Sequence, residues 1–113
     1  MLKQNTIAAA LALGLLTACA DTVSTDPIAV ELPHLVAEHK AYDGRIVTVS
    51  GRVAHFDDPL HYWLEDDAFH RVALLPDASV SAMTGDQVRV TGKFTTSPDQ
   101  GRQIEVTEVM LIE

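Results

Sequence analysis

Three histidines lie near the ends of expected strands, with two carboxylates between the first two of them. His55, His61 and His70 are separated by only a few residues, and Asp57 and Asp58 lie in the first gap. Imidazole and carboxylate groups are ligands for Zn²⁺ or Cu²⁺, and adjacent strands can bring such side chains together. The spacing does not impose three or four converging ligands, so three separate solvated histidines are the alternative. We therefore consider two hypotheses: the protein binds Zn or Cu at these residues, or it has no cofactor.

Aromatic and cationic side chains follow in the same stretch, at Tyr62, Trp63, Phe69 and Arg71. An aromatic ring beside a cation can stack on the face of a sugar or a base. If Leu64 points into the core, strand alternation places Tyr62 beside it and Trp63 on the outer face. We therefore predict a candidate ligand-binding group formed by Tyr62, Trp63, Phe69 and Arg71. The alternative is that both Tyr62 and Trp63 are core residues, because a small barrel with few aromatics needs them for packing.

The sequence contains no recognisable catalytic motif. None of its serines lies in a G-x-S-x-G nucleophile motif. The carboxylate pairs Asp57-Asp58 and Asp66-Asp67 lie in expected turns, where Asp is favoured because it hydrogen-bonds the backbone. A chain this small also offers little room for a deep pocket that excludes water. We expect no catalytic residues and no enzyme activity.

Composition narrows the class of protein further. The chain has 113 residues, 47% of them hydrophobic, which allows one compact domain. Its 8 Lys+Arg against 16 Asp+Glu give a formal charge of −8. Binding of nucleic acid through its phosphates needs a basic surface and is therefore disfavoured. The single Cys excludes an intramolecular disulfide and a Cys-based zinc site.

The first 18 residues have the pattern of a signal peptide. Lys3 supplies the positive charge, and an apolar run of ten residues follows from Ile7 to Leu16. A membrane-spanning helix needs roughly 20 apolar residues, so this run is too short to be an anchor helix. Residues 1–18 are therefore predicted to be removed.

The end of this segment, Leu16-Thr17-Ala18-Cys19, resembles the lipobox of bacterial lipoproteins. That resemblance implies cleavage before Cys19 and lipidation of Cys19, which would anchor the protein stably to a membrane surface. In the lipoprotein sorting pattern an Asp directly after the Cys favours the inner membrane, and here Ala20 holds that place. We therefore expect a protein of the bacterial cell envelope, anchored to the outer membrane and facing the periplasm.

The mature chain divides into a tether and one domain. Residues 19–27 are small and polar and end in Pro27, so they are expected to be a lipidated tether. The domain is expected to cover residues 28–113. A short helix is predicted over Pro33–Ala41, because apolar residues have helical spacing there and Gly44 follows as a stop.

From Gly44 onward the hydrophobic period changes to two, which predicts strands. The connections between them are rich in Asp, Pro and Gly, as turns are. The longest connection, residues 76–86, has apolar residues at helical spacing and is expected to hold a helical turn. Five strands are expected, at Ile46–Phe56, His61–Leu64, Phe69–Leu75, Gln87–Phe94 and Gln103–Ile112.

An internal similarity links the first and fourth of these strands. Residues Gly44–Val53 and Gly85–Phe94 share a Gly, alternating valines and a second Gly, 41 residues apart. The second glycines, Gly51 and Gly92, fall on the same face as the valines, where a missing side chain lets a strand bend sharply. A chance recurrence of a common β pattern is the alternative.

Five strands, a helical turn after the third and bent first and fourth strands resemble the OB fold, a five-stranded Greek-key barrel. The stretches Asp43–Gly51, Trp63–Asp66 and Gly85–Lys93 are similar to small OB-fold proteins of bacterial envelopes. The expected fold class is therefore an all-β OB-fold barrel with a short N-terminal helix. In that fold, ligands bind across the second and third strands and the loops beside them, but the fold does not specify the ligand.

Periplasmic copper and silver chaperones with a small OB barrel offer a further comparison. His55 and Trp63 match their His and Trp ligands, but Asp66 and Ala68 stand where methionine ligands would be expected. Three functions follow from the sequence. The first is a lipid-anchored binding module for an envelope protein or glycan, the second is periplasmic metal binding by the three histidines, and the third is binding of single-stranded nucleic acid, which the charge disfavours.

Overall fold

The longest elements of the domain are three strands whose side chains alternate between the core and solvent. A computed structural model describes residues 26–112. Strand β2 covers Ile46–Asp57, β5 covers Gln87–Ser97 and β6 covers Gly101–Leu111. Alternate residues such as Val47 and Val49 in β2 and Val88 and Val90 in β5 are fully buried. Period-two burial is what a strand with one core face requires, and the mostly β structure confirms the predicted all-β class.

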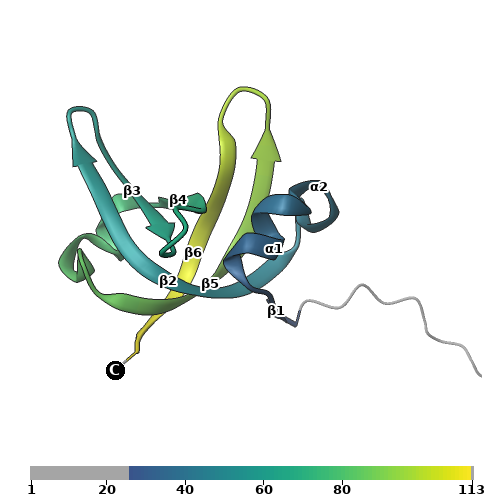
Figure 1. The fold of residues 1–113 in the computed structure, drawn as a ribbon, viewed down its shortest axis with the longest axis horizontal. Coiled ribbons are helices and arrows are strands. Elements are labelled where there is room, and N and C mark those ends of the chain that lie inside the picture. The colour runs from purple at the N-terminus through teal and green to yellow at the C-terminus, as the bar shows by residue number, and fades with distance from the viewer. Residues whose placement is uncertain (1–25, 113) are drawn as a thin grey trace, which may run out of the picture.

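The strands form one six-stranded sheet in the order β1-β2-β3-β4-β6-β5 (Figure 1). The shorter members are β1 (Ile28–Ala29), β3 (Leu60–Glu65) and β4 (Arg71–Leu75). Strand β2 also pairs with β5, so the pairings from β2 through β3, β4, β6 and β5 return to β2. Strand β1 was not expected from the sequence. It lies parallel to β2 over two residue pairs and precedes the first helix.

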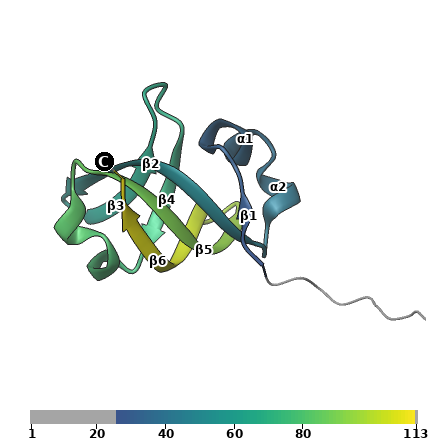
Figure 2. The same cartoon turned by 90° about the horizontal axis from the view of Figure 1, so that it is seen from below.

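Two short helices replace the single predicted helix. Helix α1 covers Leu32–Ala37 and α2 covers His39–Tyr42. The helix is interrupted at Glu38, whose φ of −111° and ψ of 34° are not helical. Leu32 and Leu35 of α1 are buried in the core. The helices therefore cover one end of the sheet, as the view in Figure 2 shows.

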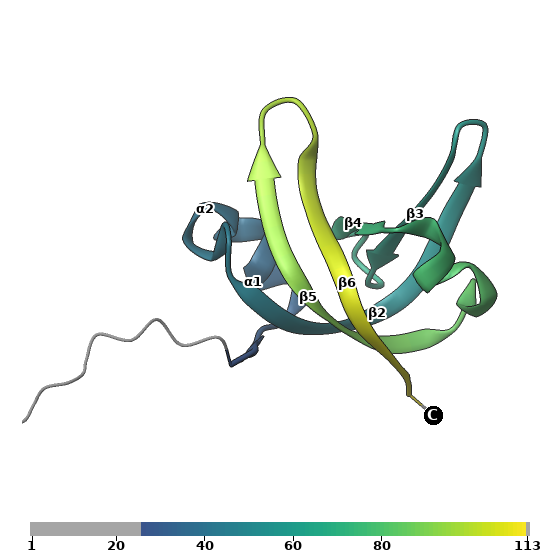
Figure 3. The ribbon, with the colours of Figure 1, turned by 180° about the vertical axis from the view of Figure 1, so that it is seen from behind.

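The connection after β4 contains two 3-10 helices, η3 (Asp77–Ser79) and η4 (Ser81–Met83). Val80 lies between them and is fully buried. Figures 2 and 3 show this connection at the opposite end of the sheet from α1 and α2. Both ends of the core are thus covered by residues outside the main strands.

The two similar segments found in the sequence pair with each other. Strands β2 and β5 are antiparallel, and Val47 lies opposite Gly92 while Gly51 lies opposite Val88. Both glycines are buried on the core side. A Cβ on Gly92 would meet the backbone oxygen of Glu105 and the side chain of Ile104, so only glycine fits there without a shift of its neighbours.

Candidate binding face on β3 and β4

The outer face of β2, β3 and β4 carries the side chains whose chemistry the sequence singled out. Strand register places Trp63 between Ala54 of β2 and Ala73 of β4. Directly paired residues project to the same side of a sheet, so the indole of Trp63 has two small neighbours across the strands. Leu64, next in β3, is fully buried. The predicted outward orientation of Trp63 and inward orientation of Leu64 agrees with this arrangement.

The next row of the same face is formed by Arg52, Glu65 and Arg71. Glu65 is mostly buried, with 10% of its side chain exposed. Its carboxylate accepts a hydrogen bond from Nε1 of Trp63 at 2.8 Å and one from Nη2 of Arg52 at 2.9 Å. Arg71 donates its Nε to the same carboxylate at 3.2 Å. One carboxylate therefore fixes the indole and two guanidinium groups.

These contacts also determine the charge of Glu65. The hydrogen bond from Trp63, followed by that from Arg52, lowers the pKa of Glu65 below its usual value, and burial opposes this effect. The carboxylate is thus ionised at neutral pH. An ionised acceptor makes stronger hydrogen bonds than a neutral one, so Trp63 and Arg71 are held in defined orientations before any ligand binds.

The aromatic and cationic side chains form a continuous strip along this face, made up of Phe56, His61, Trp63, Arg71 and Phe69. The guanidinium carbon of Arg71 lies 4.9 Å from the Trp63 ring centroid and 5.9 Å from that of Phe69. The His61 ring lies 5.1 Å from Trp63 and 6.0 Å from Phe56. We call this set the aromatic-cation strip.

A pocket of about 430 Å³ opens on the strip. Arg102 reaches it from β6 and donates its Nε to the backbone oxygen of Arg71 at 3.3 Å. The pocket wall on the β4 side is shallow, because the side chain of Ala73 that lines it is small. The complete lining is Phe56, His61, Trp63, Arg71, Ala73 and Arg102, with no carboxylate among them.

Phe69 projects from the turn between β3 and β4, with 66% of its surface exposed. Its φ of 64° lies in the left-handed region, which is rare for a bulky residue. The turn is stabilised by Asp66, whose Oδ1 accepts the amides of Ala68 at 3.0 Å and His70 at 2.9 Å. An exposed aromatic residue in a strained conformation is typical of functional sites.

The structure does not bring Tyr62, the fourth predicted ligand-binding residue, to this face. Tyr62 is 7% exposed and belongs to the hydrophobic core. Its ring stacks on that of His55, with centroids 5.7 Å apart. Strand alternation places Tyr62 on the opposite side of β3 from Trp63. Of the four predicted residues, Trp63, Phe69 and Arg71 share the outer face.

The three histidines proposed as metal ligands are not brought together either. His55 Nε2 lies 3.1 Å from Oδ1 of Asp57. His61 donates its Nδ1 to the backbone oxygen of Pro59 at 2.8 Å, and His70 pairs with Asp66 at 2.9 Å. Within residues 26–112, no group of three or more His, Cys, Asp or Glu side chains is placed to hold a metal ion.

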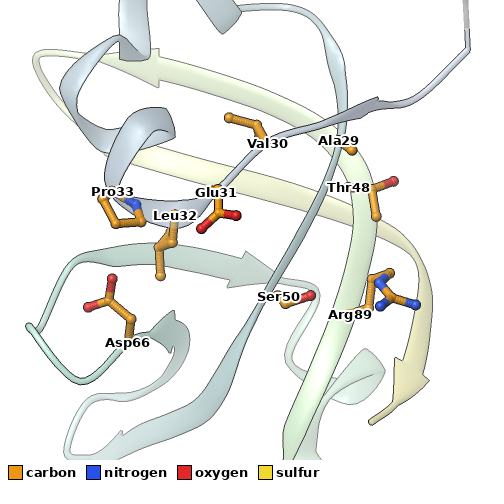
Figure 4. A pocket seen from close by; sticks show the side chains of 9 residues that line it. All are labelled: Ala29, Val30, Glu31, Leu32, Pro33, Thr48, Ser50, Asp66 and Arg89. Carbon is orange, nitrogen blue, oxygen red and sulfur yellow. The ribbon is translucent and has the colours of Figure 1, made fainter.

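A second pocket of about 430 Å³ lies between the start of α1 and β2 (Figure 4). Its charged lining residues are Glu31, Asp66 and Arg89. Asp66 is already engaged by His70 and the turn described above. Because this pocket combines both signs of charge, it does not favour a ligand of either charge.

Sequence reasoning missed four residues of the face: Arg52, Phe56, Glu65 and Arg102. The expected strand His61–Leu64 ends one residue before Glu65, which is the last residue of β3. The alternation of His61, Trp63 and Glu65 was the available signal, because it extends the outer face by one more position. Arg102 is brought to the pocket by the pairing of β4 with β6, in which Ala73 lies opposite Gln103. No local pattern indicates that pairing.

The chain matches no protein-family model, and no curated protein shows significant similarity to it. In the described part of the chain, no helix is long and apolar enough to cross a membrane. The predicted signal peptide, Cys19 and most of the predicted tether lie outside the described residues.

Proposed function

We propose that this protein is a non-catalytic binding module with an OB-fold barrel, which recognises a component of the bacterial envelope. The return of the strand pairings from β5 to β2 supports a five-stranded barrel, with β1 as an added edge strand. The segment between β4 and β5, which holds η3 and η4, corresponds to the helical turn that the OB fold has there. Strands β3 and β4 then take the positions at which OB domains bind ligands.

The observation that carries this proposal is the fixed position of Trp63 on an open face. Its indole is hydrogen-bonded to Glu65 and lies beside Arg71, while its cross-strand neighbours are alanines. Burying a tryptophan in the core would satisfy packing better, so partial exposure of the chain's one Trp favours a binding role. A residue held in place before binding loses little entropy when a ligand arrives.

The lining of this face favours binding over catalysis. The pocket contains aromatic rings, guanidinium groups, an imidazole and an alanine, but no nucleophile and no carboxylate that could act as a base toward His61. We therefore assign recognition, and no reaction, to this site.

The cell envelope is the proposed location, on the basis of the lipobox-like stretch Leu16-Thr17-Ala18-Cys19. Lipidated Cys19 would hold the domain at the outer membrane, on its periplasmic side. The anchor would then contact membrane lipids, and the aromatic-cation strip would bind an envelope protein or glycan. We assign no cofactor.

An amide NMR titration of the full chain in detergent micelles tests the binding role. The glycan arm uses soluble disaccharide-peptide fragments released from peptidoglycan, and the protein arm uses a detergent-solubilised envelope protein fraction. We expect saturable shifts in one arm, clustered on β3 and β4 around Trp63.

The same titration is repeated with Trp63→Ala and with the control Leu111→Ala, which removes an exposed apolar side chain at the far end of β6. Shifts that disappear only in Trp63→Ala support the proposal. Shifts that persist in Trp63→Ala, or saturable shifts in neither arm, contradict it.

A further inference from the structure

Two cationic side chains of the binding face line its pocket, and one of them, Arg71, is paired with Glu65. The chain carries 16 Asp+Glu and 8 Lys+Arg. The pocket on the aromatic-cation strip is nevertheless lined by two arginines, Arg71 and Arg102, and by no carboxylate. A cationic pocket on an acidic protein indicates that the ligand bears negative charge at a defined point, since complementary charge determines specificity.

Both arginines keep donor groups for such a ligand. Arg71 bonds the Glu65 carboxylate through Nε, and Arg102 bonds the Arg71 carbonyl through Nε. Within residues 26–112, Arg102 forms no ion pair and Arg71 pairs only with Glu65. The terminal nitrogens of both guanidinium groups therefore remain available to face the pocket. Two nitrogens of one guanidinium group can bind a carboxylate in a forked geometry.

The arrangement of strands argues against a peptide that would bind as an added strand. β3 pairs with β2 on one side and β4 on the other, and β4 pairs with β3 and β6. Both sides of β3 are paired over residues 62–65 and both sides of β4 over residues 73–74, which leaves only short strand ends for strand addition. A nucleic acid is disfavoured as well, because the formal charge of −8 repels a chain of phosphates.

We propose that the ligand is an acidic sugar, whose ring packs in the pocket against Trp63 and whose carboxylate pairs with Arg71 and Arg102. This inference rests on the proposed function of the same face. The guanidinium of Arg71 lies over the indole of Trp63 and the His61 ring lies beside it, while the small side chain of Ala73 leaves room in the pocket for a sugar ring to pack against this group. The pocket volume of about 430 Å³ lies in the range of small-ligand sites.

Fluorescence of the single Trp provides a direct test, because Trp63 itself lines the pocket. The full chain in detergent micelles is titrated with a galacturonic acid trisaccharide and with its methyl ester, which keeps the rings and removes the charge. We expect saturable binding of the acid, at least about tenfold tighter than the ester, as the loss of charge-assisted hydrogen bonds predicts.

Arginine variants test the location of the charge. Arg102→Gln is expected to weaken binding of the acid about tenfold and to leave binding of the ester unchanged. Arg71→Gln is expected to act in the same direction, although it also removes a partner of Glu65. Arg89→Gln serves as the matched control, since Arg89 is exposed on β5 and lines the other pocket.

The outcomes separate this inference from the function on which it rests. Equal affinity for acid and ester, or an unchanged affinity in Arg102→Gln, overturns the acidic sugar. Either result leaves the binding role intact if the peptidoglycan fragments or the envelope proteins still shift the amide NMR signals around Trp63. Tighter binding of a single-stranded thymidine oligonucleotide than of the uronate also overturns the proposal. The absence of a response to all probes removes both.

Discussion

Glu65 is the residue on which the geometry of the binding face depends. It accepts hydrogen bonds from Trp63, Arg52 and Arg71 and is mostly buried. Glu65→Gln keeps the shape but removes the charge, and an amide group cannot serve three donors equally. We expect the free energy of unfolding at pH 7 to fall by about 1–3 kcal/mol, measured by urea denaturation followed by far-UV circular dichroism. Glu108→Gln, at an exposed position of β6, is the control and should change little.

The same substitution has a signature in the pH dependence of stability. Because the pKa of Glu65 in the folded state lies below its usual value, the unfolded chain takes up the proton first as the pH falls. The stabilisation is therefore complete above about pH 5 and is lost below about pH 4. The stability difference between wild type and Glu65→Gln should be constant at neutral pH and shrink in acid. A difference that stays constant down to pH 3 would contradict this role of Glu65.

Phe69 combines backbone strain with an exposed ring. A left-handed conformation costs a residue with a Cβ about 1–2 kcal/mol, and Asn tolerates it better. Phe69→Asn should therefore raise the free energy of unfolding by about 1 kcal/mol, since the ring is 66% exposed and little packing is lost. Phe56→Asn is a matched control, because Phe56 is 55% exposed in a regular strand, where Asn is unfavourable. Thermal unfolding that ranks Phe69→Asn below wild type would refute the argument from strain.

At the scale of elements, the bends of β2 and β5 depend on glycine. A Cβ on Gly51 would lie 2.8 Å from Cγ of Leu64 and 2.9 Å from the backbone oxygen of Glu65. At Gly92 the obstruction is closer and mainly backbone, from Glu105. Gly92→Ala is expected to lower the free energy of unfolding by about 3 kcal/mol and Gly51→Ala by about 1–2 kcal/mol, measured by urea denaturation. Ser50→Ala, at an exposed site in β2, controls for strand propensity. If Gly92→Ala were as stable as the wild type, β5 and β6 could move apart without a loss of stability.

The hydrophobic pattern of the sequence predicts the five long strands well, because each has one buried face. The predicted strand Ile46–Phe56 is observed as Ile46–Asp57. The predicted strand Phe69–Leu75 begins later, at Arg71, because Asp66 holds residues 68–70 in a turn. Strand β1 has only two residues, too few for a periodic pattern, and its pairing with β2 depends on contacts distant in sequence.

The binding face was predictable where strand alternation alone determines orientation. Alternation placed Trp63 outside on the condition that Leu64 points into the core, and the structure meets that condition because Leu64 is fully buried. Convergence of residues from different strands was not predictable, because it depends on register. Register separates His55 from His61, one on each side of the sheet, and brings Arg102 beside Arg71.

At the scale of the whole molecule, the charge distribution suits attachment by lipid and not by electrostatics. The formal charge is −8, and removal of residues 1–18 would make it more negative because only Lys3 is lost. Anionic headgroups repel such a domain. We therefore propose that a lipidated Cys19 provides the membrane attachment, since acyl chains contribute about 0.8 kcal/mol for each buried methylene.

Cys19→Ser tests this attachment in the intact cell. In a bacterium that processes lipoproteins, we expect the wild-type chain in the outer-membrane fraction and its N-terminal peptide to carry the mass of acyl chains. Cys19→Ser should lose that mass and leave the outer-membrane fraction, because anionic headgroups repel the acidic domain. Gln4→Asn, which changes the segment without touching Lys3, the apolar run or the lipidation site, should keep both properties of the wild type. A wild-type chain without acyl mass would contradict lipidation of Cys19. A Cys19→Ser variant that stays in the outer membrane would mean that the domain is held there without lipid, by its partner on the aromatic-cation strip.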